Sequence, residues 1–200
     1  MITSMSDILC VTNRKLCREE FFTRIEKIAV AKPAGIILRE KDLGEKEYMQ
    51  LATKAVEICR KYNTPCILHS FVDVAKRLDC KALHLPLNIL SSLSDEDKAK
   101  FLVLGASCHS PEEAIEAQKQ GCTYITAGHI FDTDCKKGLS GRGLEFLQKV
   151  CKSVKIPVYA IGGISKGNIA KVRKCGAGGA CIMSSAMICE SPKILLGELK

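Results

Sequence analysis

One polar, glycine-rich stretch carries most of the side chains in this 200-residue sequence that could do chemistry. It reads AGHIFDTDCKKGLSGRG and includes His129 and Lys136. An imidazole can accept and release protons near neutral pH, and long polar loops in compact proteins are usually functional or disordered. We therefore take His129 as the leading catalytic candidate. From position alone, a histidine bonded to backbone at the end of a strand is an equal alternative.

Two pairs of small residues later in the chain are candidates for holding an anion. Gly162 and Gly163 stand in AIGGIS, and Ser184 and Ser185 stand in IMSSAM. Adjacent glycines let backbone N–H groups approach an anion, and two serines can open a helical turn whose first N–H groups are free. Each pair alone could be a tight turn or a helix cap. Together, at the ends of the last two predicted strands, they favour a bound phosphate.

A third candidate set stands at the end of the second predicted strand. In LREKD, alternation puts Arg39 and Lys41 on one side and Glu40 and Asp42 on the other. We expect Arg39 and Lys41 to face an anionic ligand, and surface ion pairs with the two acids are the alternative. Ser107, at the end of the fifth predicted strand, adds a hydroxyl group to the expected site.

The remaining three histidines are weaker candidates. His69 and His84 stand at the ends of predicted strands, which is suggestive of a site. His109 precedes Ser110 at the start of a predicted helix, and we expect it to be structural.

Eight short apolar runs alternate with helix-like segments along the whole sequence. The runs are apolar throughout, as is typical of parallel strands buried on both faces. Strand–helix alternation implies right-handed crossovers, so we expect an α/β fold, a single (β/α)8 TIM barrel over residues 1–200, with an open doubly wound sheet as the alternative. The predicted strands are Ile8–Thr12, Gly35–Arg39, Cys66–His69, Ala82–Leu85, Leu102–Ala106, Tyr124–Ala127, Val158–Ile161 and Ala180–Met183. The predicted helices are Arg18–Ala31, Glu45–Tyr62, Phe71–Leu78, Asp95–Phe101, Ser110–Gln120, Leu144–Val154, Gly167–Cys175 and Pro192–Leu199.

The composition argues against several other classes of protein. The net charge is +8, but Lys and Arg are spread along the chain and no nucleic-acid module is matched, so we expect no nucleic-acid partner. None of the 12 cysteines has C-x-x-C spacing, so a zinc ribbon has no support. No secretory signal and no long apolar stretch is present, so we expect a cytoplasmic protein with no membrane partner. The oligomeric state is open, a homodimer included.

Five stretches, taken together and in order, resemble the thiamine-phosphate-synthase superfamily. They are LCVTNRKL at 9–16, ILREKDL at 37–43, LGASCHSPEEA at 104–114, PVYAIGGIS at 157–165 and ACIMSSA at 180–186. The resemblance spans almost the whole chain. It implies the barrel and a phosphate ligand of the thiamine pathway.

Within that superfamily, the sequence departs from the synthase pattern. Synthases have Asn-Asp after the third strand and an acidic residue soon after the fourth, which hold magnesium on a pyrophosphate. Here His69-Ser70 stands at the place of Asn-Asp, and the fourth strand is followed by Pro86 with no carboxylate before Asp95. Because a hard divalent ion prefers carboxylate oxygens, synthase activity is the less expected reading.

The loop after the sixth strand resembles the sister branch, the TenI-like thiazole tautomerases. Their loop has the pattern GHxFxTDCKKGLxGRG, and this chain reads GHIFDTDCKKGLSGRG. The resemblance implies that His129 is the catalytic acid and base.

The implied reaction moves a proton from ring carbon C2 of a carboxythiazole phosphate to its exocyclic carbon, with no metal or other cofactor. The phosphate would lie against Gly163, Ser184 and Ser185, and Arg39, Lys41 or Lys136 would neutralise the carboxylate. Thiamine-phosphate synthase and a non-catalytic regulatory barrel remain alternatives.

Overall fold

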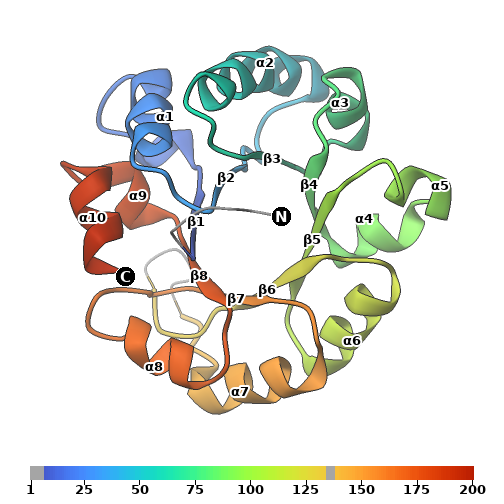
Figure 1. The fold of residues 1–200 in the computed structure, drawn as a ribbon, viewed down its shortest axis with the longest axis vertical. Coiled ribbons are helices and arrows are strands. Elements are labelled where there is room, and N and C mark those ends of the chain that lie inside the picture. Colours follow the sequence, from blue (N-terminus) through green and yellow to red (C-terminus); the bar gives the residue numbers. More distant parts are fainter. Residues whose placement is uncertain (1–6, 134–137) are drawn as a thin grey trace. The chain divides into compact units, whose positions relative to one another are not determined.

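The computed structural model describes residues 7–133 and 138–200. Its eight strands follow one another in the order β1 to β8 in a closed barrel, and helices lie between them in sequence (Figure 1). The predicted TIM-barrel fold is therefore confirmed. The strands are β1 (Ile8–Val11), β2 (Gly35–Leu38), β3 (Cys66–His69), β4 (Ala82–Pro86), β5 (Val103–Cys108), β6 (Tyr124–Gly128), β7 (Val158–Ile161) and β8 (Gly179–Ile182).

The helices agree with the predicted segments to within three residues at most ends. They are η1 (Arg14–Leu16), α1 (Phe21–Val30), α2 (Glu45–Lys61), α3 (Val72–Arg77), α4 (Leu87–Ser92), α5 (Asp95–Lys98), α6 (Pro111–Lys119), α7 (Gly143–Ser153), α8 (Ile169–Lys174), α9 (Ser184–Ile188) and α10 (Pro192–Glu198). Helix α4 was not predicted, because it begins directly after Pro86 with no side-chain cap. Gly176, at φ +90°, follows the end of α8 as predicted.

Contacts divide the chain into two compact units, and each is described by itself. The first unit comprises residues 1–83 and 183–200, and the second comprises residues 84–182. The single domain over residues 1–200 stays a prediction.

In the first unit, β1, β2 and β3 are parallel, and β1 and β2 are buried along their whole length. Helices α1 and α2 lie side by side (Figure 1). Tyr48 of α2 is fully buried, donates a hydrogen bond to the Leu38 carbonyl at 2.6 Å and accepts one from the His69 amide at 2.9 Å. This one hydroxyl therefore ties α2 to the carboxyl ends of β2 and β3.

In the second unit, β5, β6, β7 and β8 are parallel, with Ser107 opposite Thr126 and Gly128 opposite Ile161. Helix α6 begins where the sequence indicates, because the Ser110 hydroxyl accepts a hydrogen bond from the Glu113 amide at 3.1 Å. The register brings the ends of β5, β6 and β7 to one edge, where the predicted polar residues follow.

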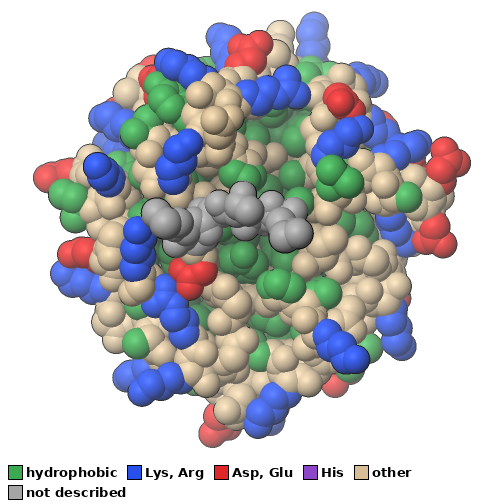
Figure 2. Space-filling model, in the orientation of Figure 1, with side chains coloured by type: hydrophobic (Ala, Val, Ile, Leu, Met, Phe, Trp, Pro, Cys, Tyr) green, Lys and Arg blue, Asp and Glu red, His purple; other side chains and the backbone are tan. Residues whose placement is uncertain are grey.

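On the face drawn in Figure 2, the Lys and Arg side chains of the described residues are dispersed among uncharged and acidic ones. Among the described residues, no helix has the length and apolar character needed to cross a lipid bilayer.

Candidate functional site

His129 follows β6 directly, and its side chain is buried with one ring nitrogen engaged and the other not. Nε2 lies 3.0 Å from the Ser140 carbonyl oxygen and 3.2 Å from that of Leu139. Carbonyl oxygens only accept, so Nε2 carries the proton in the neutral ring. Nδ1 is buried and has no hydrogen-bond partner among the residues that the structure describes. A basic lone pair is therefore held out of water with nothing bonded to it.

The backbone around His129 is fixed from two sides. The amides of Ile130 and Phe131 donate to the carbonyls of Ile161 and Gly162 at 2.9 and 3.1 Å. On the other side, the Arg142 amide donates to the His129 carbonyl at 3.0 Å. The ring is thereby held between the end of β7 and the segment that precedes α7.

Gly162 and Gly163 have a structural role beside His129 that the sequence did not reveal. Both have positive φ, +102° and +65°. A Cβ atom on Gly162 would lie 2.6 Å from the His129 Cβ, and one on Gly163 would lie 2.7 Å from the Asp132 carbonyl oxygen. Side chains at these two positions would displace the His129 segment. Their contact with a phosphate stays a prediction.

Ser107, the predicted hydroxyl, belongs to a chain of three side chains on β4, β5 and β6. His84 is buried and bonds through Nε2 to the Ser107 hydroxyl and through Nδ1 to the Tyr124 hydroxyl, both at 2.9 Å. Ser107 is half-buried. The structure therefore joins Ser107 to His84, which the sequence had placed only at the end of a strand.

In the first unit, the residues of LREKD differ in burial. Glu40 is buried and accepts hydrogen bonds from the Thr12 hydroxyl at 2.7 Å and the Arg14 amide at 3.1 Å, whereas Lys41 is exposed and Arg39 is half-buried. Glu40 and Asp42 both pair with the Arg14 guanidinium, so the two acids lie on the same side of this segment, as the alternation predicts. Ligand binding by Arg39 and Lys41 stays a prediction.

Arg14 is a residue that the sequence reasoning missed. Its guanidinium pairs with Glu40 at 3.2 Å and with Asp42 at 2.6 Å. This hydrogen bond, together with one from Lys15, holds the pKa of Asp42 well below its usual range. Nothing in the spacing of Arg14 and Asp42, which are 28 residues apart, could have indicated the pair.

Three further predicted positions can be reported individually. Ser184 and Ser185 form the first turn of α9, so the predicted helical turn is confirmed. Lys136 lies outside the described residues. Contact of Ser184 and Ser185 with a phosphate stays a prediction.

The carboxylates that magnesium would need are not supplied at the expected positions. His69 is the last residue of β3, with its Nδ1 2.8 Å from the Ser70 hydroxyl, and Pro86 ends β4. The buried Glu40 already accepts hydrogen bonds from Thr12 and Arg14. The residues present at these strand ends therefore do not fit a magnesium–pyrophosphate site.

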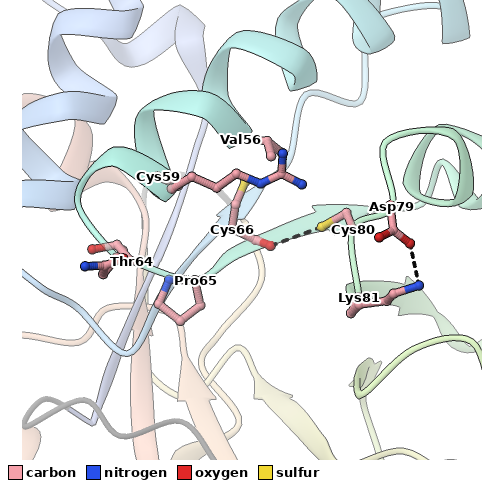
Figure 3. A pocket seen from close by; sticks show the side chains of 10 residues that line it. Val56, Cys59, Thr64, Pro65, Cys66, Asp79, Cys80 and Lys81 are labelled. Carbon is pink, nitrogen blue, oxygen red and sulfur yellow. Dashed lines mark hydrogen bonds and ion pairs between the residues drawn. The ribbon is translucent and has the colours of Figure 1, made fainter.

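A pocket of about 490 Å³ lies in the first unit, at the amino ends of β3 and β4. Figure 3 shows the Cys80 thiol bonded to the Cys66 carbonyl and Lys81 paired with Asp79. Burial raises the pKa of the Cys80 thiol, so it stays protonated and is a poor nucleophile. TIM-barrel chemistry takes place at the carboxyl ends of the strands, so this pocket is not the candidate active site.

Comparison with known proteins places the chain in one family. The sequence model described as thiamine monophosphate synthase matches residues 8–186. A thiamine-phosphate synthase of Methanobrevibacter smithii is 34% identical over 199 residues, which cover 95% of this chain and 93% of that protein. One from Clostridium tetani is 31% identical over 195 residues, which cover 94% and 91%.

The solved structures agree. Thiamine phosphate pyrophosphorylase from Pyrococcus furiosus superimposes with a TM-score of 0.81 at 32% identity, and the match covers 96% of this chain and 93% of that one. The superfamily resemblance read from the sequence is therefore confirmed, while the matches do not single out the tautomerase branch. The chain belongs to the thiamine monophosphate synthase (TMP-TENI) family.

Proposed function

We propose that this member of the family is a thiazole tautomerase, which converts a non-aromatic carboxythiazole phosphate into its aromatic isomer by proton transfer through His129. The observation that carries the proposal is the buried Nδ1 of His129, which has no partner among the described residues, while Nε2 is anchored on the Ser140 carbonyl. A general base needs a free lone pair and a fixed direction, and this ring has both.

The proton balance requires only one imidazole. Nδ1 takes the proton from ring carbon C2, and the electrons of that C–H bond move into the ring. The exocyclic alkene carbon then takes a proton back from Nδ1, which leaves an aromatic ring and a neutral histidine. While the His129 imidazole carries this extra proton, its Nε2–H remains bonded to the Ser140 and Leu139 carbonyls, which stabilise the imidazolium.

The remaining predicted residues would bind the substrate. Gly162, Gly163, Ser184 and Ser185 are assigned to its phosphate. Arg39, Lys41 or Lys136 would neutralise its carboxylate and the negative charge that develops as C2 loses its proton. Ser107 would add a hydroxyl contact.

Thiamine-phosphate synthase is the second candidate, and the relatives favour it. The proteins at 31–34% identity carry that name, as does the matching family. One fold can host different reactions, so the reacting residues must decide between them. The ends of β3 and β4 lack the carboxylates that a synthase uses for magnesium, and His129 supplies a base that a pyrophosphate displacement does not require.

The test is to supply the purified protein with both sets of substrates. With the carboxythiazole phosphate tautomer, the appearance of the aromatic ring is followed by ultraviolet absorbance. His129→Asn should lower kcat about 100- to 10,000-fold, the usual contribution of a general acid or base. The exposed His109, which is paired with Glu113, offers the matched control His109→Asn, and this variant should retain the wild-type rate.

Three outcomes would overturn the proposal. An unchanged rate in His129→Asn would remove the role of His129. Formation of thiamine phosphate from the pyrimidine pyrophosphate and thiazole phosphate with magnesium would establish the synthase instead. Binding of the thiazole phosphate with no turnover of either kind would indicate a regulatory protein.

A further inference from the structure

The side chains of Tyr124, His84 and Ser107 form a continuous hydrogen-bonded chain inside the second unit. We propose that Tyr124 and His84 are positioning residues, which fix the Ser107 hydroxyl as a hydrogen-bond donor to an anionic oxygen of the substrate. The contact between Ser107 and substrate rests on the proposed function. The hydrogen bonds from Tyr124 to His84 and from His84 to Ser107, here called the relay, rest on the geometry of these three residues.

The direction of the relay follows from Tyr124. Its side chain is buried, and burial raises the pKa of its phenol, so the hydroxyl keeps its proton. A buried hydroxyl donates its hydrogen where it can, because an unmade bond is costly. The only acceptor that the described residues offer Tyr124 is the His84 Nδ1, at 2.9 Å. Tyr124 is therefore the donor and Nδ1 the acceptor.

The next bond is set by this first one. A neutral imidazole that accepts at Nδ1 carries its proton on Nε2. The His84 Nε2–H then donates to the Ser107 oxygen at 2.9 Å. Ser107 accepts in this bond, so its own hydrogen remains available for another acceptor, and the residue is half-buried rather than sealed.

The direction of these hydrogen bonds distinguishes the Tyr124–His84–Ser107 relay from a nucleophilic catalytic triad. In a catalytic triad, the histidine accepts the serine proton and a carboxylate stabilises the resulting charge. Here Nε2 is already protonated, and the third member is a neutral phenol. Ser107 is therefore suited to donate a hydrogen bond and unsuited to attack a substrate.

Packing keeps the phenol in place. A Cβ atom on Gly105 would clash with the Tyr124 ring, so the absence of a side chain at this position makes room for the ring. Tyr159 packs against the same ring edge to face, with the centroids 5.7 Å apart. Gly105 and Ser107 point to the same face of β5, which places the ring and the serine on one side of the strand.

The direct test is Tyr124→Phe, which removes one oxygen and keeps the ring. Without the phenol, His84 can adopt either tautomer and Ser107 loses its fixed orientation. In Tyr124→Phe we expect KM for the thiazole phosphate to rise about 3- to 10-fold with kcat nearly unchanged. Ser107→Ala should raise KM about 10- to 100-fold, as for loss of a hydrogen bond to a charged group.

In the double variant Tyr124→Phe/Ser107→Ala the two effects on KM should be far from additive, because both act through the Ser107 hydroxyl. Tyr62→Phe, which removes a hydroxyl bonded to Glu26 in the other unit, is the matched control and should leave KM unchanged.

A second readout does not depend on turnover. Long-range proton–nitrogen NMR spectra of histidine-labelled protein report which ring nitrogen carries the proton, and His84→Gln assigns the signal. The expected result is an Nε2–H tautomer for His84 in the wild type and a mixture in Tyr124→Phe. An Nδ1–H tautomer in the wild type would overturn the relay, as would an unchanged KM in Tyr124→Phe beside a raised KM in Ser107→Ala. Absence of turnover with the expected tautomer would instead refute the proposed function alone.

Discussion

The two buried histidines of the second unit, His84 on β4 and His129 after β6, share a residue type and differ in their bonding. His84 has both ring nitrogens bonded, to Tyr124 and to Ser107. His129 has Nε2 bonded to backbone carbonyls and Nδ1 bonded to nothing among the described residues. Both rings are almost fully buried, so exposure does not distinguish them.

The difference in bonding assigns His84 a structural role and leaves His129 with a nitrogen that can react. A buried polar group left without a partner costs free energy, so most are satisfied. The unbonded Nδ1 of His129 is an exception of the kind found at functional sites. A fully bonded ring such as His84 has its tautomer fixed and is suited to orienting another group.

Replacing each histidine by glutamine should give the largest contrast, because the glutamine amide nitrogen takes the place of Nε2 and nothing takes the place of Nδ1. At position 129 the amide can still donate to the Ser140 carbonyl, so the free energy of unfolding should change by less than about 1 kcal/mol while turnover falls as in His129→Asn. At position 84 the buried Tyr124 hydroxyl loses its acceptor, Nδ1. We expect His84→Gln to lower the free energy of unfolding by about 1–3 kcal/mol.

Urea unfolding followed by circular dichroism measures both variants under the same conditions. A His129→Gln protein that unfolds as easily as His84→Gln would contradict the comparison, because Nδ1 of His129 would then have a structural partner. A His84→Gln protein as stable as the wild type would also contradict it.

Gly162→Ala should have the next largest effect, because the added Cβ would lie 2.6 Å from that of His129. Gly121→Ala is the matched control, since Gly121 has a similar φ of +88° and open space around its Cβ position. Both variants share the cost of a positive φ, about 1 kcal/mol or more. Only Gly162→Ala should also lower kcat, about 10- to 100-fold, by displacing the His129 ring.

Steady-state kinetics and urea unfolding of the two alanine variants separate the shared cost from the specific one. If Gly162→Ala and Gly121→Ala had the same kcat, the packing of Gly162 against His129 would have no role in catalysis. Gly162 could then be interpreted through phosphate contact alone, which would appear as a raised KM.

The fold was readable from the sequence because each strand carries its own signal. Runs such as Gly35–Leu38 and Val158–Ile161 are apolar throughout, and polar or glycine-containing segments end them. Helix α6 has a serine cap and a proline at its first position. Helix α4 lacks such signals, which is why it was missed. Local chemistry thus sets most element boundaries in this chain.

The candidate site was only partly readable, because its residues are bonded across long separations. The position of His129 after a strand was visible, but its bond to Ser140 depends on how residues 138–143 fold back. The packing of Gly162 against His129 and the pair of Arg14 with Glu40 are tertiary contacts that no spacing rule contains. Alternation in LREKD placed Glu40 and Asp42 on one side, but their common partner Arg14 could not be read from the sequence.

The smallest expected effect concerns Asp132, which supports His129 indirectly. Its carboxylate accepts a hydrogen bond from the Gly141 amide at 2.6 Å, next to the Ser140 carbonyl that anchors the His129 ring. Asp132→Ala should loosen this segment and lower kcat about 3- to 10-fold, the effect of one exposed hydrogen bond, while Asp132→Asn should restore most of the rate because its amide oxygen can still accept. Equal losses in the alanine and asparagine variants would assign the effect to the negative charge. No loss in either would show that the bond between the Ser140 carbonyl and the His129 Nε2 does not depend on Asp132. The orientation of the His129 ring would then be set by the backbone bonds of its segment to β7 and to Arg142.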